Sequence, residues 1–261
     1  MSCDDGIGAV YGPAMISPAA VNPGDVDAVV FDMGGVLVVP APGAIARIVA
    51  DAGVELDFDD HAARRAHYGG IAALTARLAD GPLSESDRSV WSRYDEAYFL
   101  ALGLNGGRLE AAVEARQAHR AVGDSADVWT HVLEENRAAF HAIAERRAVA
   151  VVTNNNGTAI EQCRDMGFCQ IGPGPLASVA AIVDSAVVGI AKPDPRIFAP
   201  AIEALGTEPA RTLYVGDTVH ADVHGAMAAG MPVVQLDPFD HHADHDHWRL
   251  PDLVALQNHL A

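Results

Sequence analysis

Short apolar runs that end in glycine or polar residues recur along the 261-residue chain. The first covers residues 27–33, is rich in valine and stops at Gly34 and Gly35. Such a run is typical of a strand in the middle of a parallel sheet, because both faces of that strand are buried. Further runs of this kind lie at residues 148–153, 212–215 and 232–236.

Helical stretches separate the later runs. One passes through Met166 and ends at Gly167, one leads from about Arg196 to Leu205, and one ends before Gly230. Glycine is a common helix terminator because it adopts the left-handed backbone conformation without strain. Strands that alternate with helices predict right-handed crossovers and a parallel sheet covered on both faces. The predicted fold class is therefore α/β, with three layers.

The pattern changes between residues 41 and 144, where apolar residues have helical spacing, as at Ile71, Leu74 and Leu78. This region predicts an inserted α-helical subdomain. The glycines and prolines near the N-terminus predict a flexible tail. The predicted parts are a tail at 1–25, an α/β core at 26–40 and 145–261, and the helical insert at 41–144.

Three of the predicted strands end in polar residues, namely Asp32, Thr153 and Asp217. The carboxyl ends of parallel strands meet at one edge of the sheet, and ligands of open α/β sheets bind just outside that edge. We therefore expect these three side chains to converge on a binding or catalytic site.

The net charge of the chain argues against some classes of binding partner. Acidic residues outnumber basic ones 35 to 17, and the formal charge of −18 repels nucleic acid and anionic membranes. No apolar run approaches the roughly 18 residues of a membrane span. The cysteines Cys3, Cys163 and Cys169 are odd in number and lack the paired spacing of a zinc site. With no secretory signal pattern at the N-terminus, these features predict a cytoplasmic protein.

Four segments of the chain resemble the motifs of the haloacid dehalogenase-like (HAD) superfamily, in order and in context. They are Phe31–Leu37, Val152–Asn154, Lys192–Phe198 and Gly216–Asp222. The resemblance implies a Rossmann-like core and identifies the helical insert as the superfamily's cap, where substrate choice usually lies. It also implies a hydrolase, most simply a phosphatase that acts on a small phosphorylated metabolite. The oligomeric state is not indicated.

By this resemblance the Asp32 carboxylate is the nucleophile, which attacks phosphorus to form an aspartyl-phosphate that water hydrolyses. The simpler reading of Asp32 is a carboxylate that caps its loop. Nucleophile and phosphate repel each other, so Mg²⁺ is the expected cofactor, held by Asp32, Asp217 and the Gly34 carbonyl. Asp222 is expected to bind the ion directly or through water, although an acid at a helix N-terminus is also stabilising by itself.

The remaining motif residues suit a phosphate group. The Thr153 hydroxyl and the Asn154 backbone amide can hold phosphate oxygens, a role compatible with plain helix capping. Lys192 precedes Pro193 in a rigid segment, so its ammonium can neutralise both nucleophile and phosphate. For a lysine in isolation, a solvated surface position would be the default.

One position departs from the superfamily pattern. Phosphatases of the superfamily usually carry a second aspartate, the general acid, where this chain has Gly34. Its loss favours substrates with good leaving groups, such as sugar 1-phosphates and acyl phosphates, and disfavours phosphomutase chemistry. Two alternatives stay open: a metal-independent dehalogenase-type hydrolase, and a non-catalytic module that binds phosphate ligands.

A histidine-rich tract at residues 241–247 has the composition of a transition-metal site. A polar loop before the last predicted helix, residues 253–260, explains it more simply. His220 and His224 have i, i+4 helical spacing but lack a third ligand in the sequence nearby.

Overall fold

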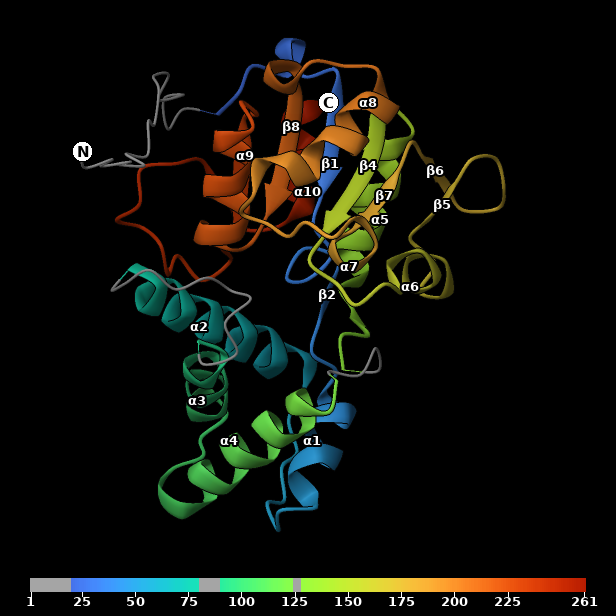
Figure 1. The fold of residues 1–261 in the computed structure, drawn as a ribbon. Coiled ribbons are helices and arrows are strands. Elements are labelled where there is room, and N and C mark those ends of the chain that lie inside the picture. The colour runs from blue at the N-terminus through green and yellow to red at the C-terminus, as the bar shows by residue number, and fades with distance from the viewer. Residues whose placement is uncertain (1–19, 80–89, 124–127) are drawn as a thin grey trace, which may run out of the picture.

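The computed structural model describes residues 20–79, 90–123 and 128–261, and it has a core built on a sheet with a group of helices beside it (Figure 1). Most of the segment expected to be a flexible tail, including Cys3, lies outside the described residues. The described part of that segment forms a short 3₁₀ turn, Pro23–Asp25.

The core contains a six-stranded sheet in the order β10-β9-β8-β1-β4-β7, and every neighbouring pair is parallel. The strands are β1 (Ala28–Phe31), β4 (Ala148–Thr153), β7 (Ile182–Asp184), β8 (Thr212–Gly216), β9 (Val233–Leu236) and β10 (Arg249–Leu250). This sheet confirms the predicted α/β, Rossmann-like fold class. Strand β1 lies at the centre, between β8 and β4, so Asp32 follows a central strand.

Alternate side chains of the central strands point to opposite faces of the sheet. In β1, Val29 and Phe31 pack into one core cluster and Val30 into the other. The first face packs against α5 (Glu134–Ala144), α6 (Ala159–Asp165) and α10 (Leu253–Leu260). The second packs against α8 (Ala199–Leu205) and α9 (Gly225–Ala228). Burial on both faces explains why these strands are apolar along their whole length.

Glycine ends the core helices where the sequence predicted. Gly167 follows α6 with a φ of 73°, and Gly206 caps α8 with a φ of 64°. The helix before Gly230 begins as a π-helical turn, Val219–His224, and continues as α9. Shorter elements of the core are β5 (Cys169–Ile171), β6 (Ala177–Val179), α7 (Ser185–Val188) and the 3₁₀ turns Pro195–Phe198 and Pro209–Arg211.

The cap consists of helices that pack around a hydrophobic cluster of their own (Figure 1). They are α1 (Pro42–Ala50), α2 (Asp60–Ala79), α3 (Trp91–Ala101) and α4 (Gly106–Ala121). Ile71, Leu74 and Leu78 of α2 are buried in this cluster, as their spacing suggested. Among the described helices, none is long and apolar enough to cross a membrane.

Two short strands connect cap and core. β2 (Val38–Val39) leaves the core and pairs antiparallel with β3 (His131–Val132), which returns to it. Helix α5 follows β3 and packs against α10, with Phe140 and Ile143 in the core cluster. Thus α5, inside the range 41–144 expected for the cap, packs with the core, because the β2–β3 ribbon has already carried the chain back to the sheet.

Candidate active site

The turn after β1 places Asp32 at the carboxyl edge of the sheet. The Asp32 backbone N–H donates to the Val215 carbonyl at 2.9 Å, which ties the turn to β8. Gly35 has a φ of 67°, and a Cβ atom there would lie 2.0 Å from Asp217 Oδ2 and 2.7 Å from His67 Nε2. The close approach of the two loops therefore requires glycine at position 35.

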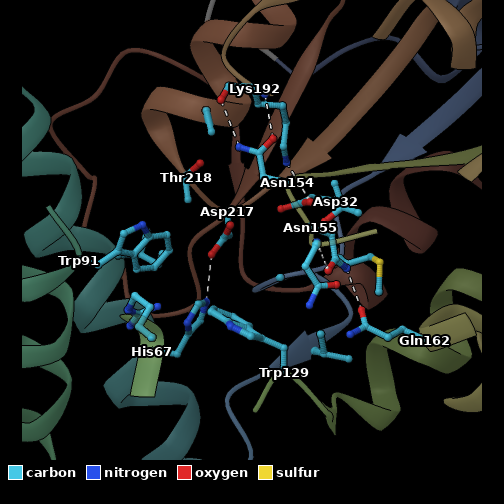
Figure 2. Close-up of a pocket in the computed structure, with 18 of the residues that line it drawn as sticks. Asp32, His67, Trp91, Trp129, Asn154, Asn155, Gln162, Lys192, Asp217 and Thr218 are labelled. Carbon is cyan, nitrogen blue, oxygen red and sulfur yellow. Dashed lines mark hydrogen bonds and ion pairs between the residues drawn. The ribbon is translucent and has the colours of Figure 1, made fainter. Parts of the chain in front are cut away.

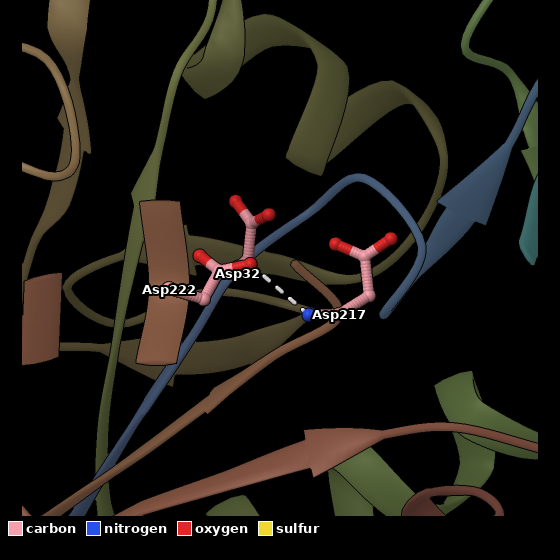
Figure 3. A group of neighbouring side chains, drawn as sticks. All are labelled: Asp32, Asp217 and Asp222. Carbon is pink, nitrogen blue, oxygen red and sulfur yellow. Dashed lines mark hydrogen bonds between the residues drawn. The ribbon is translucent and has the colours of Figure 1, made fainter. Parts of the chain in front are cut away.

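Three buried carboxylates gather at this edge, those of Asp32, Asp217 and Asp222 (Figure 3). Their oxygens lie within 4.8 Å of one another, and they form the one group of potential metal ligands found among the described residues. Burial raises the pKa of Asp32 to about 7, and repulsion from Asp222 and Asp217 adds to the shift against the attraction of Lys192. Burial, followed by repulsion from Asp222, also raises the pKa of Asp217 well above its usual value.

This donor set fits a divalent cation. Carboxylate oxygens are the ligands that Mg²⁺ prefers, and three acids share one buried lysine, so the cluster carries excess negative charge. A cation between Asp32 and Asp217 would remove the repulsion that raises their pKa values.

Lys192 is the cation already present in the site. Its Nζ lies 2.9 Å from Asp32 Oδ1 and 2.6 Å from Asp222 Oδ1, and it donates to the Tyr214 hydroxyl at 2.9 Å. Burial by itself would lower the pKa of Lys192, but the charges of Asp222 and Asp32 raise it above its usual value. The side chain is 2% exposed, so this ammonium is a fixed positive charge beside Asp32.

Asp222 uses both carboxylate oxygens in hydrogen bonds. Oδ2 accepts from the backbone N–H groups of Asp217 and Thr218 and from the Thr218 hydroxyl, at 2.9–3.0 Å. Oδ1 accepts from Lys192 and from the Tyr214 hydroxyl. Although burial would raise the pKa of Asp222, Lys192 and these hydrogen bonds lower it. Asp222 therefore stays ionised and fixes both the Asp217 loop and Lys192.

Thr153 ends β4 and is buried beside the cavity. The Asn154 side chain pairs with the Lys192 backbone: Oδ1 accepts from the Lys192 N–H at 2.8 Å, and Nδ2 donates to its carbonyl at 3.1 Å. This clamp holds the β4 loop against the Lys192 loop. The sequence indicated a role only for the backbone amide of Asn154 and gave no sign of this clamp.

A cavity of about 380 Å³ opens over these residues, between core and cap (Figure 2). The predicted site residues that line it are Asp32, Gly34, Thr153, Asn154, Lys192 and Asp217; Asp222 does not. The cap contributes residues that sequence reasoning missed, chiefly His67, Ile71, Trp91 and Arg120, and Trp129 joins them from the returning connection. Nothing in the local sequence distinguishes these from ordinary packing residues.

His67 is the cap residue in closest contact with the carboxylates. Its Nε2 lies 3.0 Å from Asp217 Oδ2, and its Nδ1 lies 2.9 Å from the Tyr94 hydroxyl oxygen. Burial lowers the pKa of His67 to about 3, against the attraction of Asp32. His67 is therefore a neutral hydrogen-bonding group at the edge of the site.

The histidine-rich tract forms hydrogen bonds instead of a cluster of ligands among the described residues. His242 Nδ1 lies 3.2 Å from Gln235 Nε2, and its Nε2 lies 3.2 Å from the Thr75 hydroxyl of the cap. His247 Nε2 lies 2.6 Å from Gln235 Oε1. His242 and His247 thus hold Gln235 in place, and His242 also contacts α2.

Comparison with known proteins identifies the family of the chain. A model of the haloacid dehalogenase-like hydrolases matches residues 26–230, so the chain belongs to this family of hydrolases. The phosphoserine phosphatase of Thermus thermophilus is 31% identical over 160 residues, which cover 57% of this chain and 63% of the relative. The glyceraldehyde 3-phosphate phosphatase of Methanopyrus kandleri is 42% identical over 55 residues, 21% of this chain and 24% of the relative. The match spans less than two thirds of either relative.

Solved structures support the fold. Magnesium-bound YfnB of Bacillus subtilis superimposes with a TM-score of 0.54 at 17% identity, over 90% of this chain and 98% of YfnB. A 2-haloacid dehalogenase of Pseudomonas syringae has a TM-score of 0.51 at 19% identity, over the same shares of the two chains. These likenesses show the fold, and the fold by itself does not give the reaction.

Proposed function

We propose that the chain is a Mg²⁺-dependent phosphatase that hydrolyses a small phosphorylated metabolite through an aspartyl-phosphate on Asp32. The observation that carries this proposal is the group of three buried carboxylates beside Lys192, two of which, Asp32 and Asp217, line a cavity. The cavity volume of about 380 Å³ suits a small ligand. Named relatives that are phosphatases support the same activity.

Asp32, Asp217 and the Gly34 carbonyl are the groups we assign to the metal. Asp222, whose oxygens are already hydrogen-bonded, would act on the ion through water or through its hold on the Asp217 loop. When bound, Mg²⁺ supplies positive charge that lets the phosphate approach a carboxylate.

In the first half of the reaction, the Asp32 carboxylate attacks phosphorus and the bond to the leaving oxygen breaks. Lys192, the Thr153 hydroxyl and the Asn154 backbone N–H stabilise the charge on the phosphoryl oxygens. Water then attacks phosphorus, which releases inorganic phosphate and regenerates the Asp32 carboxylate. Because Gly34 provides no acid, we expect the leaving oxygen to be one that departs without strong proton donation, as from a sugar 1-phosphate or an acyl phosphate.

The site favours this reaction over a metal-independent dehalogenation. Attack on carbon needs one anionic nucleophile, whereas Asp217 beside Asp32 adds only repulsion unless a cation is present. A non-catalytic phosphate-binding module would not need a buried nucleophile paired with a fixed lysine.

A screen of phosphorylated metabolites, with Mg²⁺ and with a chelator, tests the proposal. Turnover that requires Mg²⁺ and disappears in Asp32→Asn is the expected result. Turnover of a haloalkanoate in the chelator would support the dehalogenase instead, and binding of phosphate esters without any turnover would support the binding module.

A further inference from the structure

Helix α2 of the cap touches two loops of the metal site with consecutive residues. His67 Nε2 lies 3.0 Å from Asp217 Oδ2, as the dashed line in Figure 2 marks. The Tyr68 hydroxyl donates to the Gly35 carbonyl, next to the expected Gly34 ligand. The cap therefore contacts the loop of Asp217 and the loop that follows Asp32.

The direction of these hydrogen bonds follows from the chemistry of the partners. With a cation bound, the Asp217 carboxylate is ionised and only accepts, so His67 donates to it from Nε2. The other ring nitrogen, Nδ1, lies 2.9 Å from the Tyr94 hydroxyl, which can donate to it. Burial raises the pKa of Tyr94 well above its usual value, so that hydroxyl keeps its proton.

The ring of His67 is also held by packing. The rings of Tyr68, Tyr94 and Trp129 lie around it, with centroid separations of 5.0, 5.9 and 5.6 Å and edge-on contacts. Both His67 and Asp217 are almost completely buried. The hydrogen bond therefore has a fixed donor, a fixed direction and little competition from water.

We infer that His67 positions Asp217 for the metal, so that α2 completes the metal site when the cap lies against the core. The inference rests on the proposed function, because it concerns the same metal. The contact uses one carboxylate oxygen and leaves the charge of Asp217 intact, as an orienting partner of a metal ligand does. Both ring nitrogens of His67 have partners, Asp217 and Tyr94, so His67 is a positioning residue and does not replace the missing general acid.

Metal binding and docking of the cap against the core are thermodynamically linked. If the docked cap strengthens metal binding, the metal strengthens cap docking by the same factor. Mg²⁺ without substrate should therefore slow amide hydrogen exchange in α2 of the wild type. In His67→Phe this protection should be lost.

The direct test is metal affinity measured by titration calorimetry with Mg²⁺ or Mn²⁺ alone. His67→Phe keeps a planar ring and removes the donor, and it should raise the metal Kd about 10-fold or more. His67→Gln retains an N–H donor and should restore part of this loss. Tyr94→Phe, which removes one hydroxyl, should raise the Kd less, and it carries the test if His67→Phe does not fold.

Thr75→Val is the matched control. It breaks another hydrogen bond between α2 and the core, to His242. His242 reaches Asp217 only through Gln235 and the Asp217 backbone carbonyl, so Thr75→Val should change the metal Kd far less than His67→Phe. A folded His67→Phe with the wild-type Kd would overturn the inference, as would an equal loss in Thr75→Val. If the wild type binds neither metal, the proposed metal dependence fails together with the inference about His67. If the wild type binds metal and His67→Phe binds it equally well, only the inference about His67 fails.

Discussion

The Asp32 carboxyl carries an electrostatic cost in the absence of a cation. Its pKa is raised to about 7 by burial and by its acidic neighbours, whereas an unfolded aspartate titrates near pH 4. The folded state then holds an extra proton between these values, so stability is lost as pH rises from about 4 through about 7. In a chelator, the free energy of unfolding of the wild type should fall through this window more steeply than that of Asp32→Asn. Urea unfolding at several pH values measures the difference, and parallel profiles would contradict it.

Asp217 and Asp222 are neighbours with different expected roles. Asp217→Asn removes an anionic ligand and should raise the Mg²⁺ concentration for half activity by at least about tenfold. Asp222→Asn should instead lower the rate at saturating Mg²⁺ and destabilise the fold by about 3–5 kcal/mol, because buried Lys192 loses a partner. Metal titrations of activity and urea unfolding compare the two. Equal metal requirements in both variants would argue against this division of roles.

Gly34 is the residue at which the superfamily pattern is broken, and the structure leaves room for a side chain there. A Cβ atom would meet Trp129 at 3.5 Å, an ordinary contact, whereas at Gly35 it would overlap Asp217. Gly34→Asp should therefore fold and should speed the hydrolysis of alkyl phosphates more than that of nitrophenyl phosphate, because acid catalysis matters most for basic leaving groups. Rates over a graded series of leaving groups test this. Equal gains across the series would show that the new carboxylate does not act as an acid.

At the scale of elements, α5 is a helix whose partner the sequence could not identify. Phe140 is fully buried, with its ring centroid 4.9 Å from that of Phe31 in β1. Phe140→Ala should lower the free energy of unfolding by about 3–5 kcal/mol through loss of burial and the cavity left behind. Ile160→Ala, at an exposed position on α6, is the control and should have little effect. A small effect of Phe140→Ala in urea unfolding would contradict the packing of α5 against the sheet.

Element types were predictable from the sequence where the local pattern is long enough. β4 and α10 have the predicted bounds, because their apolar residues and end signals lie within the segment itself. β2 and β3 have two residues each, and they form strands only because they pair with each other where the chain leaves and re-enters the core. The helical spacing of α5 resembles that of the cap helices, so only tertiary contacts place it in the core.

At the scale of the whole molecule, some residues of the candidate site were predictable from the sequence and others were not. Asp32, Thr153 and Asp217 were predictable because parallel strands bring their ends to one edge, and Lys192 was predictable from the motif that contains it. The structure places all four around one cavity. His67 was not predictable, because its contact with Asp217 joins residues 150 positions apart through the docking of the cap. The part of the candidate site that the core supplies is thus predictable from local sequence, whereas the part that the cap supplies depends on how cap and core pack together.

The proposed reaction requires that Asp32 itself becomes phosphorylated. Enzyme mixed with acetyl phosphate and Mg²⁺, quenched in acid during turnover and analysed by peptide mass spectrometry, tests it most directly. We predict one phosphoryl group on the peptide that contains Asp32, removable by hydroxylamine and absent both in the chelator and in Asp32→Asn. Sustained turnover with no phosphoryl group on that peptide, or undiminished turnover in Asp32→Asn, would contradict the account.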